Sequence, residues 1–345
     1  WLTDEDLFSR VYPMDVRPQG QDIIRTWLFS SMVRAHLEFG DNPWRHAAIS
    51  GWILDPDRKK MSKSKGNVVT PMALLEKHGS DAVRYWAASA RLGVDATFDE
   101  QQMKIGRRLA MKVLNASKFA LSMGGEGAPA DMDATAVTEP ADRAVLAGLA
   151  EVVDEATASF DAYDHTRALE LAESYFWAFC DDYLELVKDR AYSADPTARS
   201  ARVTLNIAVD VFLRLLAPFI PYATEEVWSW FRTGSVHRAA WPASEPLRAA
   251  AAGADAEILR VAGEALTALR KVKSENKVSQ RTTYAAVSLD VAEADRERLN
   301  AVHADLVRAA HVRGNLTLRS VTSEAPVAVA AYELDPPEPK TPSRV

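Results

Sequence analysis

The feature that most limits how this chain can fold is a change of pattern at Asp99. Before that residue, short apolar runs typical of strands, such as residues 46–50, alternate with helical segments, and the helical pattern over 22–40 ends at a glycine. After it, apolar residues recur at helical spacing with few interruptions. The sequence therefore predicts a mainly α protein, with an α/β portion over residues 1–98 and a helical bundle over 99–250.

The last part of the chain has a third pattern. Over residues 251–335, two helical segments alternate with runs in which apolar and polar residues alternate as in strands, which predicts a small α+β domain. The second of these helices is expected to run unbroken over 294–310. The final residues, 336–345, are rich in proline and are expected to be disordered.

Helix start signals also stand out within the α/β portion. Thr70 precedes Pro71, and Gly79 follows the apolar pattern, so we expect Thr70 to be the N-cap of one helix. Ser80 comes next and is expected to be the N-cap of a second helix.

Composition excludes several classes of protein. The 345 residues carry a formal net charge of -7, so any binding of nucleic acid must depend on local basic patches. The single cysteine, Cys180, can form neither an internal disulfide nor a cysteine-based metal site, and no cluster of Cys and His suggests zinc. No apolar run is long enough for a membrane span and no signal peptide is recognisable, so a reducing cytoplasm is expected.

A dense basic loop, RKKMSKSKGN, occupies residues 58–67 of this acidic chain. Lys60 and Lys63 are separated by two residues, so in an open turn both ammonium groups could face one polyphosphate and stabilise negative charge in a transition state. Two serines add hydroxyl donors, and a glycine lets the backbone approach closely. The alternative is a solvated basic loop, which is what most lysine runs are. The residue order of a Walker-type phosphate loop is absent.

The string KMSKSKGN is similar to the KMSKS signature of the class I aminoacyl-tRNA synthetases. In that family the loop binds ATP and stabilises the departing pyrophosphate while the amino acid is activated. The resemblance implies that Lys60 and Lys63 are catalytic and that ATP is contacted by the five residues Lys60, Met61, Ser62, Lys63 and Ser64. It also implies that residues 1–98 are the second half of a Rossmann-like catalytic domain.

A second segment, RPQGQDIIRTW, supports the first. Gly20, Asp22 and Trp27 have the spacing of a segment in the isoleucyl, valyl and leucyl group, where the glycine and the acid hold the ribose of the adenylate and the tryptophan lines the amino-acid pocket. A carboxylate suits a ribose diol, and an indole face suits a branched aliphatic side chain. Alternatively, Asp22 is a helix N-cap and Trp27 a core residue. The wording DIIRTW resembles the valyl branch, although Ser50-Gly51 departs from the His-Gly often found there.

The helical part resembles the anticodon-binding domain of the same enzymes in the stretches FCDDYLELVKDR and LLAPFIPYATEEVWSWF. This resemblance implies tRNA(Val) as the partner. The candidates for contact with the RNA backbone are two groups of cations: Lys104, Arg107, Arg108 and Lys112 on one face of a helix, and Arg270, Lys271, Lys273, Lys277 and Arg281 within LRKVKSENKVSQR. The alternative for the second group is a solvated helix end. Three aromatic residues could stack on bases or belong to the core: Trp228, Trp230 and Phe231.

Taken together, the resemblance implies a carboxy-terminal fragment of a synthetase that joins L-valine to tRNA(Val) with ATP and Mg²⁺ as substrate, without a bound cofactor, and as a monomer. The chain begins in mid-pattern at Trp1, and it lacks the HIGH signature and an editing domain, so we expect it to be inactive alone. The alternatives are a fragment of an isoleucyl enzyme and a non-catalytic tRNA-binding module.

Overall fold

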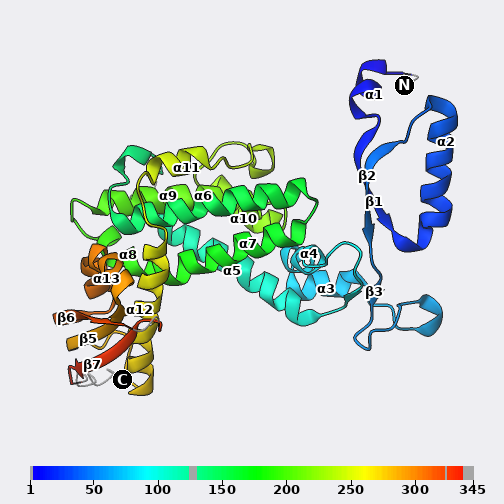
Figure 1. The fold of residues 1–345 in the computed structure, drawn as a ribbon. Helices are drawn as coiled ribbons and strands as arrows, with labels where there is room; N and C mark the ends of the chain where they lie inside the picture. The colour runs from blue at the N-terminus through cyan, green and yellow to red at the C-terminus, as the bar shows by residue number, and fades with distance from the viewer. Residues whose placement is uncertain (1–2, 124–129, 323–324, 337–345) are drawn as a thin grey trace, which may run out of the picture. The chain divides into compact units, whose positions relative to one another are not determined.

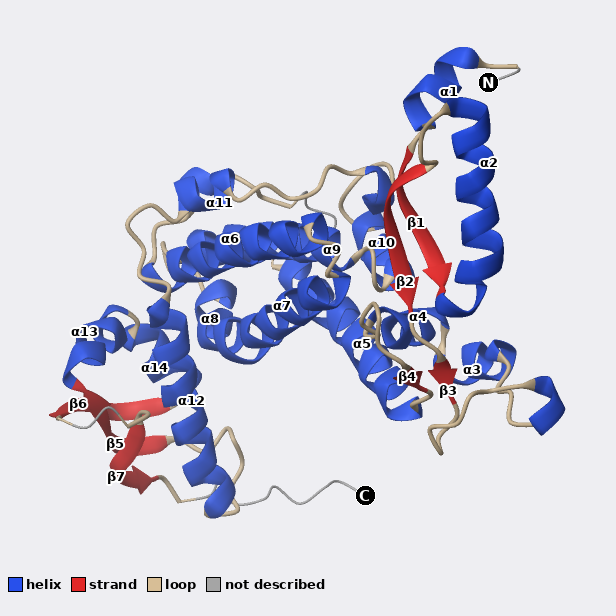
Figure 2. Cartoon of the chain, turned by 45° about the vertical axis from the view of Figure 1, so that its right-hand side comes forward, coloured by secondary structure: helices blue, strands red, loops and turns tan. Residues whose placement is uncertain are grey.

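The structure, a computed structural model, describes residues 3–123, 130–322 and 325–336. These residues fall into two compact units, whose elements are labelled in Figure 1 and coloured by type in Figure 2. The first unit comprises residues 1–111 and 157–170, and the second comprises 112–156 and 171–345. Nearly all of the tail that was expected to be disordered, residues 337–345, lies outside the described residues.

The first unit contains two short parallel strand pairs. β1 (Met14–Gly20) pairs with β2 (Trp44–Ser50), and the register ends with Gly20 opposite Ser50. Downstream, β3 (Ile53–Leu54) pairs with β4 (Ala96–Thr97). Parallel neighbours need a crossover connection, so the chain between β1 and β2 must leave the sheet and return to it.

The crossover from β1 to β2 is helical, as predicted, but not uniformly α-helical. It consists of a 3-10 turn, a π-helical turn and an α-helix: η1 (Gln21–Ile23), η2 (Ile24–Leu28) and α2 (Phe29–Phe39). The predicted end at Gly40 is confirmed, because this glycine has a φ of 76° and its N–H donates to the His36 carbonyl. The π turn was not predicted, since apolar spacing does not distinguish it from an α turn.

The remaining elements of the first unit are helical. They are α1 (Glu5–Val11), η3 (Lys63–Lys65), α3 (Pro71–His78), α4 (Ser80–Ala88), the first half of α5 (Glu100–Ser122), the end of α6 (Pro140–Asp161) and the start of α7 (His165–Ala178). Thr70 is the N-cap of α3 as expected, although its side chain makes no capping hydrogen bond. The prediction for Ser80 is wrong: Gly79 is the N-cap of α4 and Ser80 is its first helical residue.

The second unit is a helical bundle joined to a small α+β domain, which confirms the predicted fold class. The bundle helices are α6 (Pro140–Asp161), α7 (His165–Ala178), α8 (Leu184–Tyr192), α9 (Ala198–Leu216), α10 (Pro221–Ser229) and α11 (Glu245–Ala250). A second π-helical turn, η5 (Phe179–Tyr183), connects α7 to α8. The core is rich in aromatic side chains, and Phe176, Phe179 and Phe212 lie within ring-contact distance of one another.

The α+β domain packs one long helix against a three-stranded sheet. Its elements are α12 (Glu257–Glu275), β5 (Tyr284–Ala292), α13 (Glu293–Ala301), α14 (His303–Ala309), β6 (Val312–Val321) and β7 (Ala328–Leu334). β5 is central, parallel to β6 and antiparallel to β7. The prediction of one helix over 294–310 is wrong, because the chain breaks at Val302, with φ −118° and ψ 14°.

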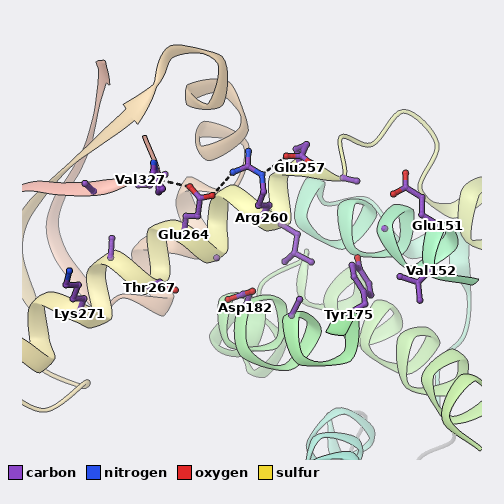
Figure 3. A pocket seen from close by; sticks show the side chains of 18 of the residues that line it. Glu151, Val152, Tyr175, Asp182, Glu257, Arg260, Glu264, Thr267, Lys271 and Val327 are labelled. Atoms are coloured by element: carbon purple, nitrogen blue, oxygen red, sulfur yellow. Dashed lines mark hydrogen bonds and ion pairs between the residues drawn. The ribbon is translucent and has the colours of Figure 1, made fainter. Parts of the chain in front are cut away.

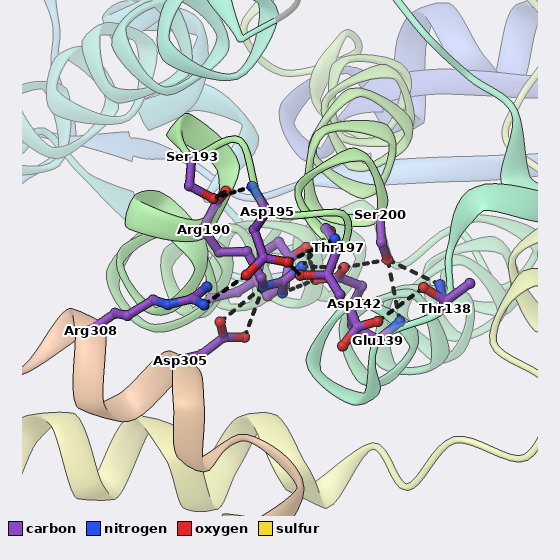
Figure 4. Close-up of polar contacts among 11 residues, drawn as sticks. Thr138, Glu139, Asp142, Arg190, Ser193, Asp195, Thr197, Ser200, Asp305 and Arg308 are labelled. Carbon is purple, nitrogen blue, oxygen red and sulfur yellow. Dashed lines mark hydrogen bonds and ion pairs between the residues drawn. The ribbon is translucent and has the colours of Figure 1, made fainter.

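A buried guanidinium ties the α+β domain to the bundle (Figure 4). Arg190 on α8 is 3% exposed and donates to both oxygens of Asp142 on α6, at 2.8 and 3.0 Å. On its other side it donates to Asp305 on α14, at 2.9 Å. Asp142 also accepts from Tyr183 at 2.8 Å and from Ser200 at 2.5 Å. The break at Val302 therefore matters, because it starts the short helix that presents Asp305.

We predict that Arg190→Met destabilises the protein by about 3–5 kcal/mol, because it leaves two desolvated carboxylates without their counter-ion. Urea unfolding followed by circular dichroism measures this. The matched control is Arg199→Met: Arg199 also binds two carboxylates, Asp131 and Asp133, but is 57% exposed, so its loss should cost about 1 kcal/mol or less. Equal losses for the two variants would contradict a special role for Arg190.

Candidate functional site

The turn after β1 places a carboxylate against a glycine. A Cβ on Gly20 would lie 2.9 Å from Oδ1 of Asp22, so a side chain at position 20 would push that carboxylate away. Asp22 is exposed and lies in the first turn of η1, but the N-cap is Gly20, without a side-chain capping bond. No described residue donates a hydrogen bond to the Asp22 carboxylate. Asp22 is therefore not the helix N-cap that the alternative interpretation predicts.

Trp27 is also not a core residue. It lies in the π-helical turn η2 and is 58% exposed. The Arg17 guanidinium lies 6.0 Å from the centre of its ring and 5.4 Å from that of Trp44. Inserted π turns occur often at functional sites, because they re-aim a side chain without ending the helix. An apolar face is thus presented beside the Gly20–Asp22 turn.

A second segment meets this turn through Asp95. The Oδ1 atom of Asp95 accepts a hydrogen bond from the Trp52 backbone N–H at 2.7 Å and a longer one from the Gln21 side chain at 3.4 Å. Gly51 has no room for a side chain, because a Cβ there would lie 2.2 Å from the Val94 carbonyl oxygen. Three stretches distant in sequence are therefore held close together at this point.

The basic loop is organised by an aspartate at its base. Asp55, which follows β3 and is 7% exposed, accepts a hydrogen bond from the Asn67 side chain at 2.7 Å and from the Lys59 backbone N–H at 2.8 Å. The bond from Asn67 is the main reason why the pKa of the Asp55 carboxyl lies below its usual range. Asn67 in turn accepts from the Ser62 N–H at 2.9 Å. One amide thus connects the two ends of the loop.

The lysines of the loop are placed differently. The ammonium of Lys60 lies 3.2 Å from the centre of the Trp52 ring, a close cation–π contact. Ser62 and Ser64 share a hydrogen bond of 3.2 Å between their hydroxyls, and Met61 is half-buried. The backbone of Lys63 begins η3, but its side chain lies outside what the structure describes. The Gly66 backbone has a φ of 69°, which favours glycine at that turn.

Three residues of this site were missed in the sequence: Trp52, Asp55 and Asp95. Asp55 could have been found, because an acid directly after a short strand and before a Pro-Asp turn often organises a loop. Trp52 directly precedes β3, and its local sequence does not distinguish a cation–π partner from a residue of the strand. Nothing local singles out Asp95, since its partners are 43 and 74 residues away in sequence.

The basic candidates on α5 differ in how their charges are used. Lys104 is exposed and no described residue forms an ion pair with it. Arg107 donates to the Lys77 carbonyl at 3.1 Å. Lys112 forms an ion pair of 2.9 Å with Asp181 and lies over the Trp177 ring at 5.5 Å, so its charge is largely committed within the protein. Arg108 is exposed and also engages another residue.

The second basic group lies on α12 and the turn after it, and its members also differ in whether their charges are paired within the protein. Arg270 donates to the Asp181 carbonyl at 3.1 Å, Lys271 lies 3.9 Å from Glu275, and Lys277 is exposed with a φ of 55°. Lys273 is buried, in contrast to the prediction that it faces RNA. Its ammonium donates to the carbonyls of Gln280 and Ala310, and burial lowers its pKa to about 8. Its role is therefore structural.

The three aromatic candidates differ in how far their side chains are exposed. Trp228 is 7% exposed and belongs to the core. Trp230 is 42% exposed and its indole N–H donates to Glu226 at 3.1 Å. Phe231 is half-buried and its ring lies 5.9 Å from that of Trp228. Of the three, Trp230 is the one with a largely exposed side chain.

Two kinds of feature are absent from the described residues. No three His, Cys, Asp or Glu side chains of this part of the chain gather as metal ligands would. None of its helices combines the length and apolar character needed to cross a bilayer.

We predict that Asn67→Ala loosens the basic loop, because it removes the hydrogen bonds that connect Asp55, Lys60 and Ser62. Limited trypsin digestion with mass detection should show cleavage after the basic residues of the loop about tenfold faster. Ser64→Ala is the matched control, since the hydroxyl of Ser64 shares a hydrogen bond with that of Ser62 and takes no part in the bonds of Asn67. Unchanged cleavage in Asn67→Ala would mean that this amide does not hold the loop.

Both parts of the chain are similar to known protein families, and most of its length is similar to individual known sequences. A family described as tRNA synthetases class I (I, L, M and V) matches residues 2–99, and the anticodon-binding domain of tRNA ligase matches residues 142–289. Valine--tRNA ligase of Thermobifida fusca (strain YX) is 63% identical over 302 residues, 87% of this chain and 34% of that protein. The corresponding ligase of Bifidobacterium longum (strain NCC 2705) is 54% identical over 364 residues, covering 97% and 40%.

Solved structures agree on the fold. The LeuRS-tRNA-LeuAMS ternary complex from Agrobacterium radiobacter K84 agnB2 superposes with a TM-score of 0.57 at 18% identity, over 83% of this chain and 32% of that chain. The methionyl-tRNA synthetase of Mycobacterium tuberculosis bound by methionyl-adenylate gives 0.52 at 26% identity, over 65% and 45%.

The chain thus spans between a third and two fifths of the length of these valine–tRNA ligases, at high identity. The similarity extends through both the part that carries the basic loop and the helical part. The isoleucyl alternative is not favoured, because these similar sequences are all valine–tRNA ligases. The chain therefore belongs to the valine–tRNA ligase family of class I tRNA synthetases.

Proposed function

We propose that this chain is the part of a cytoplasmic, monomeric valine–tRNA ligase that supplies the mobile ATP loop and the anticodon-binding surface. The whole enzyme would activate L-valine with ATP and Mg²⁺ and transfer it to tRNA(Val). The observation that carries the proposal is the KMSKSKGN string, held in a loop by the Asp55–Asn67 hydrogen bond. The 63% identity to a valine–tRNA ligase supports the choice of amino acid.

The proposed work of the loop is electrostatic. Lys60 and Lys63 would stabilise the charge that develops on the phosphates as pyrophosphate departs, an interaction stronger in the transition state than in the ground state. Lys60 lies on the Trp52 ring, so its ammonium must leave that ring to reach a phosphate. A cation–π contact of about 0.5–2 kcal/mol is weak enough to be exchanged for a charge-assisted hydrogen bond to phosphate. The serine hydroxyls and the Met61 backbone would complete the ATP contacts.

The proposed work of the β1 turn is to hold the adenylate. Asp22 has a carboxylate without a hydrogen-bond donor among the described residues, as a ribose diol requires, and Gly20 allows close approach of the backbone. Trp27 would line the pocket for the valine side chain with its exposed ring. We keep the domain division proposed from the sequence: a catalytic part over 1–98, an anticodon-binding part over 99–250, and a small domain over 251–335.

We predict that this chain supports valine activation when it replaces the matching segment of the Thermobifida fusca ligase, measured as valine-dependent ATP–pyrophosphate exchange. Lys60→Met in that chimera should lower kcat by about 10²–10³-fold, because a donor to the developing charge is lost. Lys59→Met is the matched control, since Lys59 is exposed and lies 3.8 Å from Asp57. The chain alone should show no exchange.

Several outcomes of that experiment would contradict the proposal. Exchange that depends on isoleucine rather than valine would reassign the amino acid. Equal losses in Lys59→Met and Lys60→Met would mean that the loop acts only through its total charge. Valine-dependent exchange by the isolated chain would show that the site is complete without further sequence.

We predict that the chain binds a valine tRNA transcript more tightly than an isoleucine transcript, with one tRNA per monomer. Lys104→Ala and Lys277→Ala should each reduce the slope of log affinity against log salt by about 1, because each removes one phosphate contact. Arg10→Ala serves as control, because Arg10 pairs with Asp6 on α1, outside both basic groups. Equal affinity for the two transcripts would remove anticodon recognition from this chain.

A further inference from the structure

A large cavity lies within the second unit, away from all the residues discussed as sites so far except Lys271. It has a volume of about 850 Å³ and lies between α6, α7 and η5 of the bundle and α12 with the start of β7 (Figure 3). This volume is in the range of sites that hold small organic ligands. Its walls include apolar side chains from both parts of the unit: Val152, Leu171, Leu259, Val272 and Val329.

Two glycines inside helices make room for side chains in the cavity wall. A Cβ on Gly148 of α6 would lie 2.3 Å from the Tyr175 hydroxyl, and a Cβ on Gly263 of α12 would lie 2.7 Å from Cγ of Asp182. A glycine in a helix interior costs about 1 kcal/mol relative to alanine. At Gly148 a hydrogen bond offsets this cost, because the Tyr175 hydroxyl donates to the Val145 carbonyl at 2.8 Å. At Gly263 the side chain that occupies the space of the missing Cβ is the carboxylate of Asp182.

That carboxylate has no evident structural reason to be there. Asp182 lies in the π turn η5, projects toward α12 and is half-buried, and no described residue donates a hydrogen bond to it. Burial raises its pKa, against the opposing charge of Arg270, whose guanidinium donates instead to the Asp181 carbonyl. A partly desolvated carboxylate without a donor destabilises a fold. Such a group suggests that its partner comes from outside the chain.

The charges around the cavity limit what that partner can be. Among the residues that the structure describes, six carboxylates line it, from Glu151, Glu155, Asp182, Glu257, Glu264 and Glu275, together with two cations, Arg260 and Lys271. Arg260 is already bound by Glu257 at 2.5 Å and by Glu264 at 2.6 Å, and Lys271 lies 3.9 Å from Glu275. The cavity is therefore strongly negative, and phosphate or RNA would be repelled from it.

We propose that this cavity binds a linear aliphatic amine, with an ammonium group on Asp182 and the methylene chain along the apolar wall. An ammonium supplies the donors that Asp182 lacks, and it is attracted by the net negative charge of the cavity lining. A methylene chain suits the valine and leucine side chains that line the trough. A compact inorganic cation would satisfy the charge but leave that apolar wall in contact with water.

The test is isothermal titration of the whole chain at low salt with spermidine as the probe, compared with 1,8-octanediol, a chain of similar length without charge. Spermidine should bind at one site and the diol should not. Asp182→Asn should weaken spermidine binding by about tenfold or more, because a neutral amide attracts an ammonium far less. Thr267→Trp, at an exposed position of the cavity wall, should also abolish binding by filling the trough.

Stability separates this site from a structural role. Asp182→Asn removes a carboxylate that burial disfavours, so its melting temperature should rise or stay unchanged while spermidine binding falls. Glu297→Gln is the matched control, since it removes one exposed negative charge outside the cavity and should keep wild-type affinity. The proposal is overturned if spermidine does not bind below about 10 mM, if Asp182→Asn and Glu297→Gln bind it alike, or if Asp182→Asn destabilises the protein.

Discussion

The second unit depends on one desolvated guanidinium. Arg190 satisfies both oxygens of Asp142 on one side and reaches Asp305 on the other, so a single side chain connects the bundle helices to the small α+β domain. In water such pairs contribute little, but here the arginine is 3% exposed and Asp142 is 0% exposed, so each charge requires the others. Tyr183 and Ser200 use the remaining acceptor positions of Asp142, which leaves the carboxylate fully bonded. The direction of α14, and hence the position of the sheet behind it, is fixed by this cluster.

The basic loop of the first unit also depends on a buried aspartate, but there the aspartate fixes only the base of the loop. Asp55 is buried and accepts hydrogen bonds from Asn67 and from the Lys59 backbone, so the base of the loop is fixed. Among the described side chains of the loop, no charge is buried in an ion pair, and the ammonium of Lys60 lies on the face of an indole. This division suits the ATP loop proposed above, because a rigid base would set its direction while its exposed groups change partners easily.

The parts of the structure that follow from one local rule could be predicted from the sequence. The helical period predicted the bundle, and Gly40 predicted the end of α2, because a glycine with positive φ ends helices for local steric reasons. Prediction failed where tertiary contacts decide the structure. The break at Val302 follows from packing that brings Asp305 to Arg190, and the burial of Lys273 follows from two carbonyl acceptors, Gln280 and Ala310, that a helical pattern cannot reveal. The π turns at η2 and η5 have the same apolar spacing as α turns.

The two π turns have a consequence that links the candidate site to the cavity. An extra residue in a helical turn rotates the following side chains, so one residue can leave the buried face without ending the helix. At η2 this presents Trp27, an apolar ring, to the surface beside an unpaired acid. At η5 it places the carboxylate of Asp182 in the wall of the cavity, opposite Gly263. In both places the π turn redirects a side chain, Trp27 to the surface and Asp182 to the wall of the cavity. Inserted π turns are frequent at functional sites, which fits both proposals.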